Sequence, residues 1–250
     1  MKKLNIFLFK WKNEKKGYLL PRQLNGYQYE DKDIIKTIQN IRKVWGNEPD
    51  INIISDVDVL IKGVNWIKLW SDYSDLGGCY RRLKLFEYCA NFHHGENCLM
   101  LDVDCQIYED IREIVSYCTP RFLNSYDKEN KNRIGGGLWF FKGGECVDIC
   151  NDFKEKKFQL IEEAKKKNIV GTDQAIIQIL LGGPTSNNSL GEKDGYFIAR
   201  RLRKLRIFPP KKLAVIFSHG GYLSNSYGIY LRNPWKLIFE IKARLCLKQA

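Results

Sequence analysis

The sequence predicts an α/β fold in which a mixed, mainly parallel central sheet is flanked by helices. Short apolar runs of strand length alternate with longer stretches of helical periodicity, which is the pattern of successive βα units. Residues 98–101 are apolar at every position, as expected of a strand that is buried on both faces of a sheet. No repeat of fixed period is present, so a solenoid is excluded.

The first half of the chain predicts five elements, each bounded by a recognisable signal. The helix predicted over 31–45 begins with acidic residues and ends near Gly46, since glycine commonly follows the last helical turn. The elements are, in order, a strand within residues 1–11, a helix over 31–45, a strand over 51–55, a helix over 79–92 and the strand at 98–101.

The second half predicts two further helices and three strands. Thr172 is well placed as the N-cap of one helix. The elements are strands over 121–126, 138–141 and 213–218, and helices over 145–167 and 175–181. Gly135, Gly136 and Gly137 precede the strand at 138–141, and two interpretations are open: a close approach of backbone to a ligand, or a flexible hairpin turn.

Length and composition indicate one globular domain. The chain has 250 residues, of which 44% are hydrophobic and 28% are charged, which excludes intrinsic disorder. We expect a single domain over residues 1–233, followed by a basic amphipathic helix over 234–250. No segment approaches the roughly 20 apolar residues that span a bilayer, and the first residues lack a cleavage site, so we expect a cytoplasmic protein.

The C-terminal segment leaves two interpretations open. Residues 235–248 are predicted to form a basic amphipathic helix, which either packs against the domain or docks on an anionic membrane that carries a lipid-linked acceptor. The eight cysteines include no Cys-x-x-Cys, so reduced thiols are expected in place of disulfides or a structural zinc site.

The net charge of +12 indicates an anionic partner without identifying it. A nucleotide, an acidic glycan, a lipid surface and a nucleic acid are all compatible with this charge. The densest basic run, residues 200–206, is typical of a solvated helix face.

The pattern Asp-x-Asp occurs three times, at Asp31/Asp33, Asp56/Asp58 and Asp102/Asp104. The first pair opens the predicted helix over 31–45 and is interpreted as first-turn carboxylates that the helix dipole favours. The second pair follows a predicted strand and is compatible with either a turn or a nucleotide contact. The third pair ends a fully apolar strand, where ligands of α/β sheets bind, so it is the leading candidate for a divalent metal site.

A histidine follows the last predicted strand. His219 stands directly after residues 213–218, and Gly220 and Gly221 give access to its ring. A neutral imidazole at a strand end is a suitable third metal ligand beside two carboxylates.

Several motifs together resemble glycosyltransferase family 8, whose members have the GT-A fold. The segment from Tyr80 to Tyr88 resembles the family's Tyr-x-Arg-Leu helix, and residues 99–104 resemble its metal-binding strand. Asp173-Gln174 resembles the Asp-Gln pair of the family, and His219-Gly220 with Pro234-Trp235 resembles its closing signature. The resemblance covers about residues 3–235.

The resemblance implies a role for each matching residue. Arg82 would contact the donor, Asp102, Asp104 and His219 would bind Mn²⁺ or Mg²⁺, and Asp173 and Gln174 would lie beside the transferred sugar as catalytic residues. The remaining donor contacts implied are Phe9, Lys10, Trp11, Val103, Gly136, Gly137 and Gly220, with Trp11 stacking on the base. Gly135 replaces the asparagine of the family's Asn-x-Gly, which leaves the sugar and the stereochemistry open.

We therefore expect a metal-dependent glycosyltransferase that moves a sugar from a nucleotide-sugar donor, expected to be UDP-linked, to a glycan or lipid-linked acceptor. Retention of configuration is favoured over inversion. Two alternatives are kept: a haloacid-dehalogenase-type phosphatase, in which Asp-x-Asp normally opens the domain, and a basic nucleic-acid-binding protein. The latter leaves acidic residues and His219 at strand ends unexplained, so no nucleic-acid partner is expected.

Overall fold

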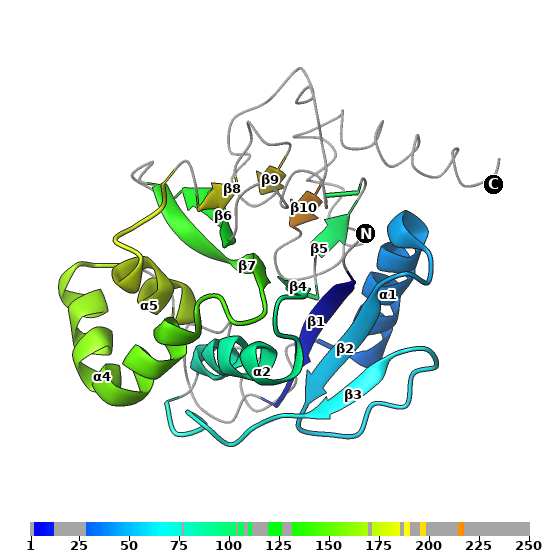
Figure 1. Cartoon of the computed structure of the whole chain (residues 1–250), viewed down its shortest axis with the longest axis horizontal. Coiled ribbons are helices and arrows are strands. Elements are labelled where there is room, and N and C mark those ends of the chain that lie inside the picture. Colours follow the sequence, from blue (N-terminus) through cyan, green and yellow to red (C-terminus); the bar gives the residue numbers. More distant parts are fainter. Residues whose placement is uncertain are drawn as a thin grey trace.

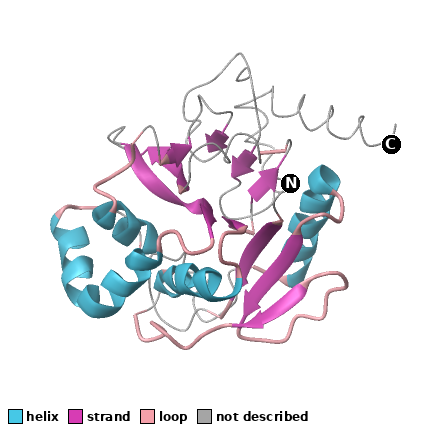
Figure 2. Ribbon diagram, in the orientation of Figure 1, coloured by secondary structure: helices cyan, strands magenta, loops and turns pink. Residues whose placement is uncertain are grey.

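The structure is a computed structural model, and Figure 1 shows the path of the chain. Helices and strands pack in layers around a central sheet (Figure 2). The residues that the structure describes are 3–12, 29–76, 78–103, 105–107, 110–111, 120–126, 132–169, 172–185, 188–190, 196–198 and 215–217.

The central sheet has seven strands in the order β3-β2-β1-β4-β7-β6-β8. Its strands are β1 (Leu4–Lys10), β2 (Asp50–Ser55), β3 (Asn65–Lys68), β4 (Asn97–Leu101), β6 (Arg121–Tyr126), β7 (Asn132–Lys142) and β8 (Ser189–Leu190). The pairs β3-β2, β2-β1, β1-β4 and β6-β8 are parallel, whereas β7 is antiparallel to both β4 and β6. The predicted mixed, mainly parallel sheet is therefore confirmed.

Helices cover both faces of this sheet (Figure 1). The helical elements are α1 (Asp31–Trp45), the 3₁₀ turn η2 (Tyr80–Leu83), α2 (Lys84–Phe92), α4 (Val147–Lys166) and α5 (Asp173–Leu180). Alternate residues of β1 enter different cores: Ile6 and Leu8 pack with α1, and Phe7 and Phe9 pack with α2, α4 and α5. The period of two along a strand thus divides the apolar interior into two layers.

A second sheet has three short strands in the order β5-β10-β9. They are β5 (Cys105–Ile107), β9 (Tyr196–Ile198) and β10 (Val215–Phe217). Strand β10 runs antiparallel to β5, with Phe217 opposite Cys105 and Val215 opposite Ile107. Of the strand predicted over 213–218, the described residues 215–217 form β10. The sequence pattern did not identify its partner strands.

Helix α1 follows the sequence prediction from end to end. It runs from Asp31 to Trp45, with Gly46 at its C-cap. The carboxylate of Asp33 accepts a hydrogen bond of 3.1 Å from the backbone N–H of Glu30, which completes a capping box. The interpretation of Asp31 and Asp33 as first-turn carboxylates is confirmed.

Asp56 follows β2 and accepts a hydrogen bond of 2.9 Å from the backbone N–H of Lys12.

The triple glycine lies inside a strand, so its interpretation as a hairpin turn is wrong. Strand β7 runs from Asn132 to Lys142 and includes Gly135, Gly136 and Gly137. The expected strand over 138–141 therefore begins six residues earlier. The register between β6 and β7 shifts at Phe122/Leu123, next to the glycines, as at a β-bulge.

Two helix starts differ from expectation. The helix predicted over 79–92 opens as the 3₁₀ turn η2 and becomes α-helical at Lys84. Thr172 is the N-cap residue of α5, as predicted, but its hydroxyl makes no capping hydrogen bond. The hydroxyl instead accepts from the backbone N–H of Cys79 at 3.1 Å, because the chain before η2 lies against the start of α5.

The cysteines agree with a reduced protein where they can be assessed. The six described cysteines, Cys79, Cys89, Cys98, Cys105, Cys146 and Cys150, are free thiols. Cys118 and Cys246 lie outside the described residues, as do the basic run 200–206 and the predicted helix 234–250. Of the helices that are described, none is long and apolar enough to cross a bilayer.

Gly143 marks the closest approach of α2 to the end of β7 and supplies a stability test. A Cβ atom there would lie 1.9 Å from the carbonyl oxygen of His93 and 2.7 Å from that of Cys89. Because both atoms are backbone, Gly143→Ala should lower the free energy of unfolding by about 3 kcal/mol, measured by urea denaturation.

Gly135→Ala is the matched control for that substitution. Its Cβ would meet Leu123 at 3.2 Å and above, a contact that the strand can accommodate by a small shift. We expect a loss of at most about 1 kcal/mol. Equal stability of the two variants would contradict the packing described for α2.

Candidate functional site

The candidate site lies beyond the carboxyl end of β4, at the edge where parallel strands of such sheets bind ligands. Strand β4 ends at Leu101, and the backbone N–H of Asp102 then donates to the carbonyl oxygen of Gly137 at 2.9 Å. The carbonyl oxygen of Asp102 accepts from the N–H of Cys105 at 2.9 Å. The hydrogen bond between Cys105 and Asp102 therefore closes a tight turn between β4 and β5.

Arg82 joins two of the predicted acidic residues. Its Nε donates to Oδ2 of Asp173 at 2.6 Å, and one terminal nitrogen donates to Oδ1 of Asp102 at 2.5 Å. Its side chain is 6% exposed, and the guanidinium carbon lies 5.3 Å from the ring centroid of Trp139. Residues from η2, the β4 end, α5 and β7 thus converge on one buried cation.

The electrostatics of this cluster favour a permanently charged Arg82. Burial opposes its charge, but the carboxylates of Asp173 and Asp102 outweigh burial and hold the pKa of Arg82 well above its usual value. Burial also raises the pKa of Asp102, the guanidinium of Arg82 lowers it and Asp173 raises it again, with a net increase. Two carboxylates sharing one cation leave the cluster with an excess of negative charge, which suits a further cation.

Asp102 retains capacity for such a cation. Its side chain is 27% exposed, whereas that of Asp173 is 1% exposed. Only Oδ1 of Asp102 is engaged by a donor within the described part of the chain. Oδ2 is therefore the oxygen through which Asp102 could bind a metal ion, and hard oxygen donors are what Mn²⁺ and Mg²⁺ prefer.

The glycines of β7 make room for this cluster. A Cβ atom on Gly136 would lie 2.3 Å from Oε1 of Gln174 and 2.7 Å from a terminal nitrogen of Arg82. The carbonyl oxygen of Gly137 accepts from Asp102 and from the thiol of Cys105 at 3.4 Å. The groups that approach Gly136 in the structure are protein side chains, and a close approach of the backbone to a ligand stays a prediction.

Two residues that sequence reasoning missed also belong to the cluster. Cys79 precedes the Tyr-Arg-Arg-Leu segment, and burial raises the pKa of its thiol to about 12, so it is a neutral group. Trp139 lies under Arg82 in β7. Their positions beside recognised motifs were the available signal, but neither residue type indicates this chemistry by itself.

The end of β1 is buried and lies near the start of α1. Nζ of Lys10 forms an ion pair of 2.5 Å with Oδ1 of Asp31. Trp11 is 8% exposed, and its ring meets the edge of Phe9 with centroids 5.8 Å apart. The proposed stacking of Trp11 on a nucleotide base stays a prediction.

Three predicted residues lie outside the described part of the chain: Asp104, His219 and Gly220. Within the described ranges, no three His, Cys, Asp or Glu residues form a metal-binding group. The side chain of Val103 is 1% exposed and packs in the α1 core, so only its backbone is available for a ligand. The structure thus brings together Arg82, Asp102, Gly136, Gly137, Asp173 and Gln174 from the predicted set.

Comparison with known proteins identifies the fold. No protein-family model and no curated protein sequence matches the chain. The galactosyltransferase LgtC, solved in complex with donor and acceptor sugar analogues, matches with a TM-score of 0.56 at 12% identity, over 91% of this chain and 93% of LgtC. The apo form of the glycosyltransferase GlyE from Streptococcus pneumoniae matches with a TM-score of 0.51 at 12% identity, over 100% of this chain and 64% of GlyE. The chain has the GT-A-like fold that its motifs predict.

Removing the charge of Arg82 alone should destabilise the protein more than removing the charges of Arg82 and Asp173 together. Arg82→Met leaves the buried carboxylate of Asp173 without its cation, which should cost about 3–5 kcal/mol of unfolding free energy. The double variant Arg82→Met/Asp173→Leu removes both charges and should recover part of that loss. Urea unfolding of the wild type and the two variants measures this. A double variant that is less stable than Arg82→Met would contradict the assigned ion pair.

Proposed function

We propose that this protein is a metal-dependent glycosyltransferase that transfers a sugar from a nucleotide-sugar donor to a glycan or lipid-linked acceptor. The observation that carries the proposal is the convergence of Arg82, Asp102 and Asp173 at the end of β4 in a GT-A-like fold. We take the donor to be UDP-linked, as the resemblance to glycosyltransferase family 8 implies.

The pairing of β5 with β10 supports a metal site made of Asp102, Asp104 and His219. Phe217 lies opposite Cys105, Asp104 immediately precedes Cys105, and His219 follows Phe217 by two residues. Since two residues of chain span at most about 7 Å, we propose that Asp104 and His219 join Asp102 in binding the cation. Two carboxylates and an imidazole are a suitable donor set for Mn²⁺ or Mg²⁺.

The proposed chemistry requires charge stabilisation on the leaving group. When bound, the divalent cation would act as a Lewis acid toward the diphosphate of the donor. Asp102 would hold this cation through the oxygen that Arg82 does not occupy. Arg82 would act mainly through the two carboxylates, since its Nε and one terminal nitrogen already donate to them.

The environment of Asp173 favours retention of configuration. An inverting enzyme needs a general base that takes a proton from the acceptor hydroxyl. The side chain of Asp173 is 1% exposed and its Oδ2 accepts from Nε of Arg82, so it is poorly placed for that task. We propose instead that Asp173 and Gln174 orient the transferred sugar.

The two alternatives have less support. A haloacid-dehalogenase-type phosphatase normally has its Asp-x-Asp at the start of the domain, but here the motif follows β4, the fourth strand in chain order. A nucleic-acid-binding protein would explain the basic run 200–206, but this run lies outside the described residues. Neither alternative accounts for a shared guanidinium between Asp102 and Asp173.

Nucleotide-sugar hydrolysis tests the proposal directly. The purified protein should release the nucleoside diphosphate from at least one nucleotide sugar in a Mn²⁺-dependent reaction. Asp104→Asn should reduce this turnover by at least about 100-fold while leaving the circular dichroism spectrum unchanged, because it removes a direct metal ligand.

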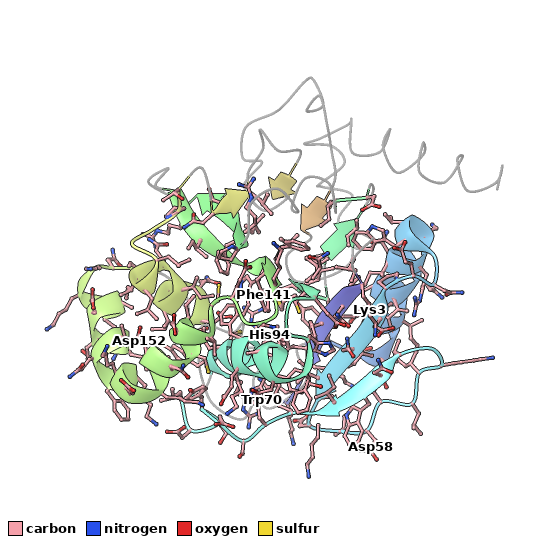
Figure 3. The ribbon with its side chains drawn as sticks, viewed as in Figure 1. Lys3, Asp58, Trp70, His94, Phe141 and Asp152 are labelled. Carbon is pink, nitrogen blue, oxygen red and sulfur yellow. The ribbon has the colours of Figure 1, made fainter. Side chains whose placement is uncertain are left out.

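Asp152→Asn is the control for that substitution. Asp152 lies on α4, where its carboxylate forms an ion pair of 2.7 Å with Lys156 (Figure 3). It should keep wild-type turnover. Normal turnover by Asp104→Asn would refute the metal assignment, and a wild type that is inactive with every nucleotide sugar would refute the proposed function.

A further inference from the structure

Helix α1 carries two polar residues among the side chains that it turns toward the sheet. Its buried stripe consists of Ile34, Ile38, Ile41 and Trp45, yet Thr37 lies within the stripe and is 1% exposed. Asn40 stands one turn further along the helix. A buried polar side chain such as that of Thr37 requires partners, and Thr37 finds one at the turn after β4. Asn40 is half-buried and finds its partner in β5.

Thr37 contacts the Asp-x-Asp turn itself. Its hydroxyl donates to the carbonyl oxygen of Val103, the residue between Asp102 and Asp104. The same hydroxyl lies 3.1 Å from the carbonyl oxygen of Asp33, within its own helix. A threonine hydroxyl has a single proton, and the shorter contact is the one to Val103. The hydroxyl therefore ties the middle of the turn to a rigid helix.

Asn40 contacts the strand that follows the turn. Its Nδ2 donates to the carbonyl oxygen of Ile107 at 2.9 Å, and its Oδ1 accepts from the N–H of Ile107 at 2.6 Å. The side-chain amide thereby takes the place of a neighbouring strand on this side of β5. On its other side β5 pairs with β10, and Ile107 lies opposite Val215.

These contacts connect α1 to the turn after β4 and to strand β5, which pairs with β10. Thr37 fixes the turn that bears the two aspartates, and Asn40 fixes the strand on which β10 pairs. Strand β10 ends two residues before His219. One helix is thus hydrogen-bonded to the backbone at Val103 and at Ile107, which stand before and after Asp104 in the chain.

We propose that Thr37 and Asn40 are positioning residues that hold the metal-binding turn and its neighbouring strand in the geometry that binds the divalent cation. This inference rests on the proposed function and extends it to residues that do not touch metal or substrate. The ion pair of Lys10 with Asp31 also anchors the start of the same helix at the end of β1. Groups that orient metal ligands typically change metal affinity by about 10–100-fold when they are removed.

A merely structural role makes a different prediction. If Thr37 and Asn40 only anchor α1, their removal lowers stability but leaves the Mn²⁺ affinity of the folded protein unchanged. If they position the turn, affinity falls in protein that is still folded. Mn²⁺ affinity and thermal stability must therefore be measured on the same samples.

The test uses the full chain and Mn²⁺ alone as the probe. Thr37→Val removes the hydroxyl at nearly constant volume, and Asn40→Asp keeps the acceptor for the N–H of Ile107 but loses the donor to its carbonyl. Thr37→Ser retains the hydroxyl and is the rescue variant. Ile41→Val is the control, since it trims a buried side chain of α1 that makes no polar contact with the turn.

Titration of Mn²⁺ by electron paramagnetic resonance should give a Kd raised about tenfold in Thr37→Val and Asn40→Asp. Thr37→Ser and Ile41→Val should bind as the wild type does. Donor hydrolysis should show the same shift in the Mn²⁺ concentration for half-activation, with turnover restored at high Mn²⁺.

Three outcomes overturn the inference. A wild-type Kd in both folded variants shows that the two residues only stabilise α1. An equal loss of affinity in Ile41→Val shows that any weakening of the helix suffices. A wild type that hydrolyses nucleotide sugars without binding Mn²⁺ removes the metal site, whereas a wild type that binds Mn²⁺ without hydrolysing any donor refutes the proposed function alone.

Discussion

The sharing of one buried guanidinium by two carboxylates is the constraint on which the candidate site depends. Arg82 is 6% exposed, so its charge is stable only while Asp102 and Asp173 accept from it. Those carboxylates lie at the end of β4 and the start of α5, and the guanidinium fits only because Gly136 has no side chain. A single ion-pair network thus fixes the relative positions of four elements and leaves the exposed oxygen of Asp102 for a ligand.

Much of the fold could be predicted because its elements carry strong local signals. Helix α1 begins and ends where its acidic first turn and Gly46 place it. The fully apolar approach to Asp102 identified β4 as a central strand. The glycine-rich part of β7 was misjudged, since glycine disfavours strands in general and only the nearby Arg82 and Gln174 explain it here. The three-residue strands β5 and β9 are too short for periodicity to reveal.

The candidate site was predictable where chemistry is visible in residue type. A charged side chain at a strand end is conspicuous, and Arg82, Asp102 and Asp173 do converge. Thr37 and Asn40 were not identified from the sequence, because their hydrogen-bond partners lie 66 and 67 positions away in the chain. The available signal was a polar residue within the apolar stripe of α1. Such interruptions indicate a partner but do not say which one.

Anomalous X-ray diffraction at the manganese edge, from crystals grown with Mn²⁺ and UDP, tests the central claim most directly. The account predicts one manganese peak at the end of β4, bound by Asp102 through the carboxylate oxygen that Arg82 leaves open, together with Asp104 and His219. A peak whose ligands exclude Asp102, or UDP bound at the site without manganese, would contradict it.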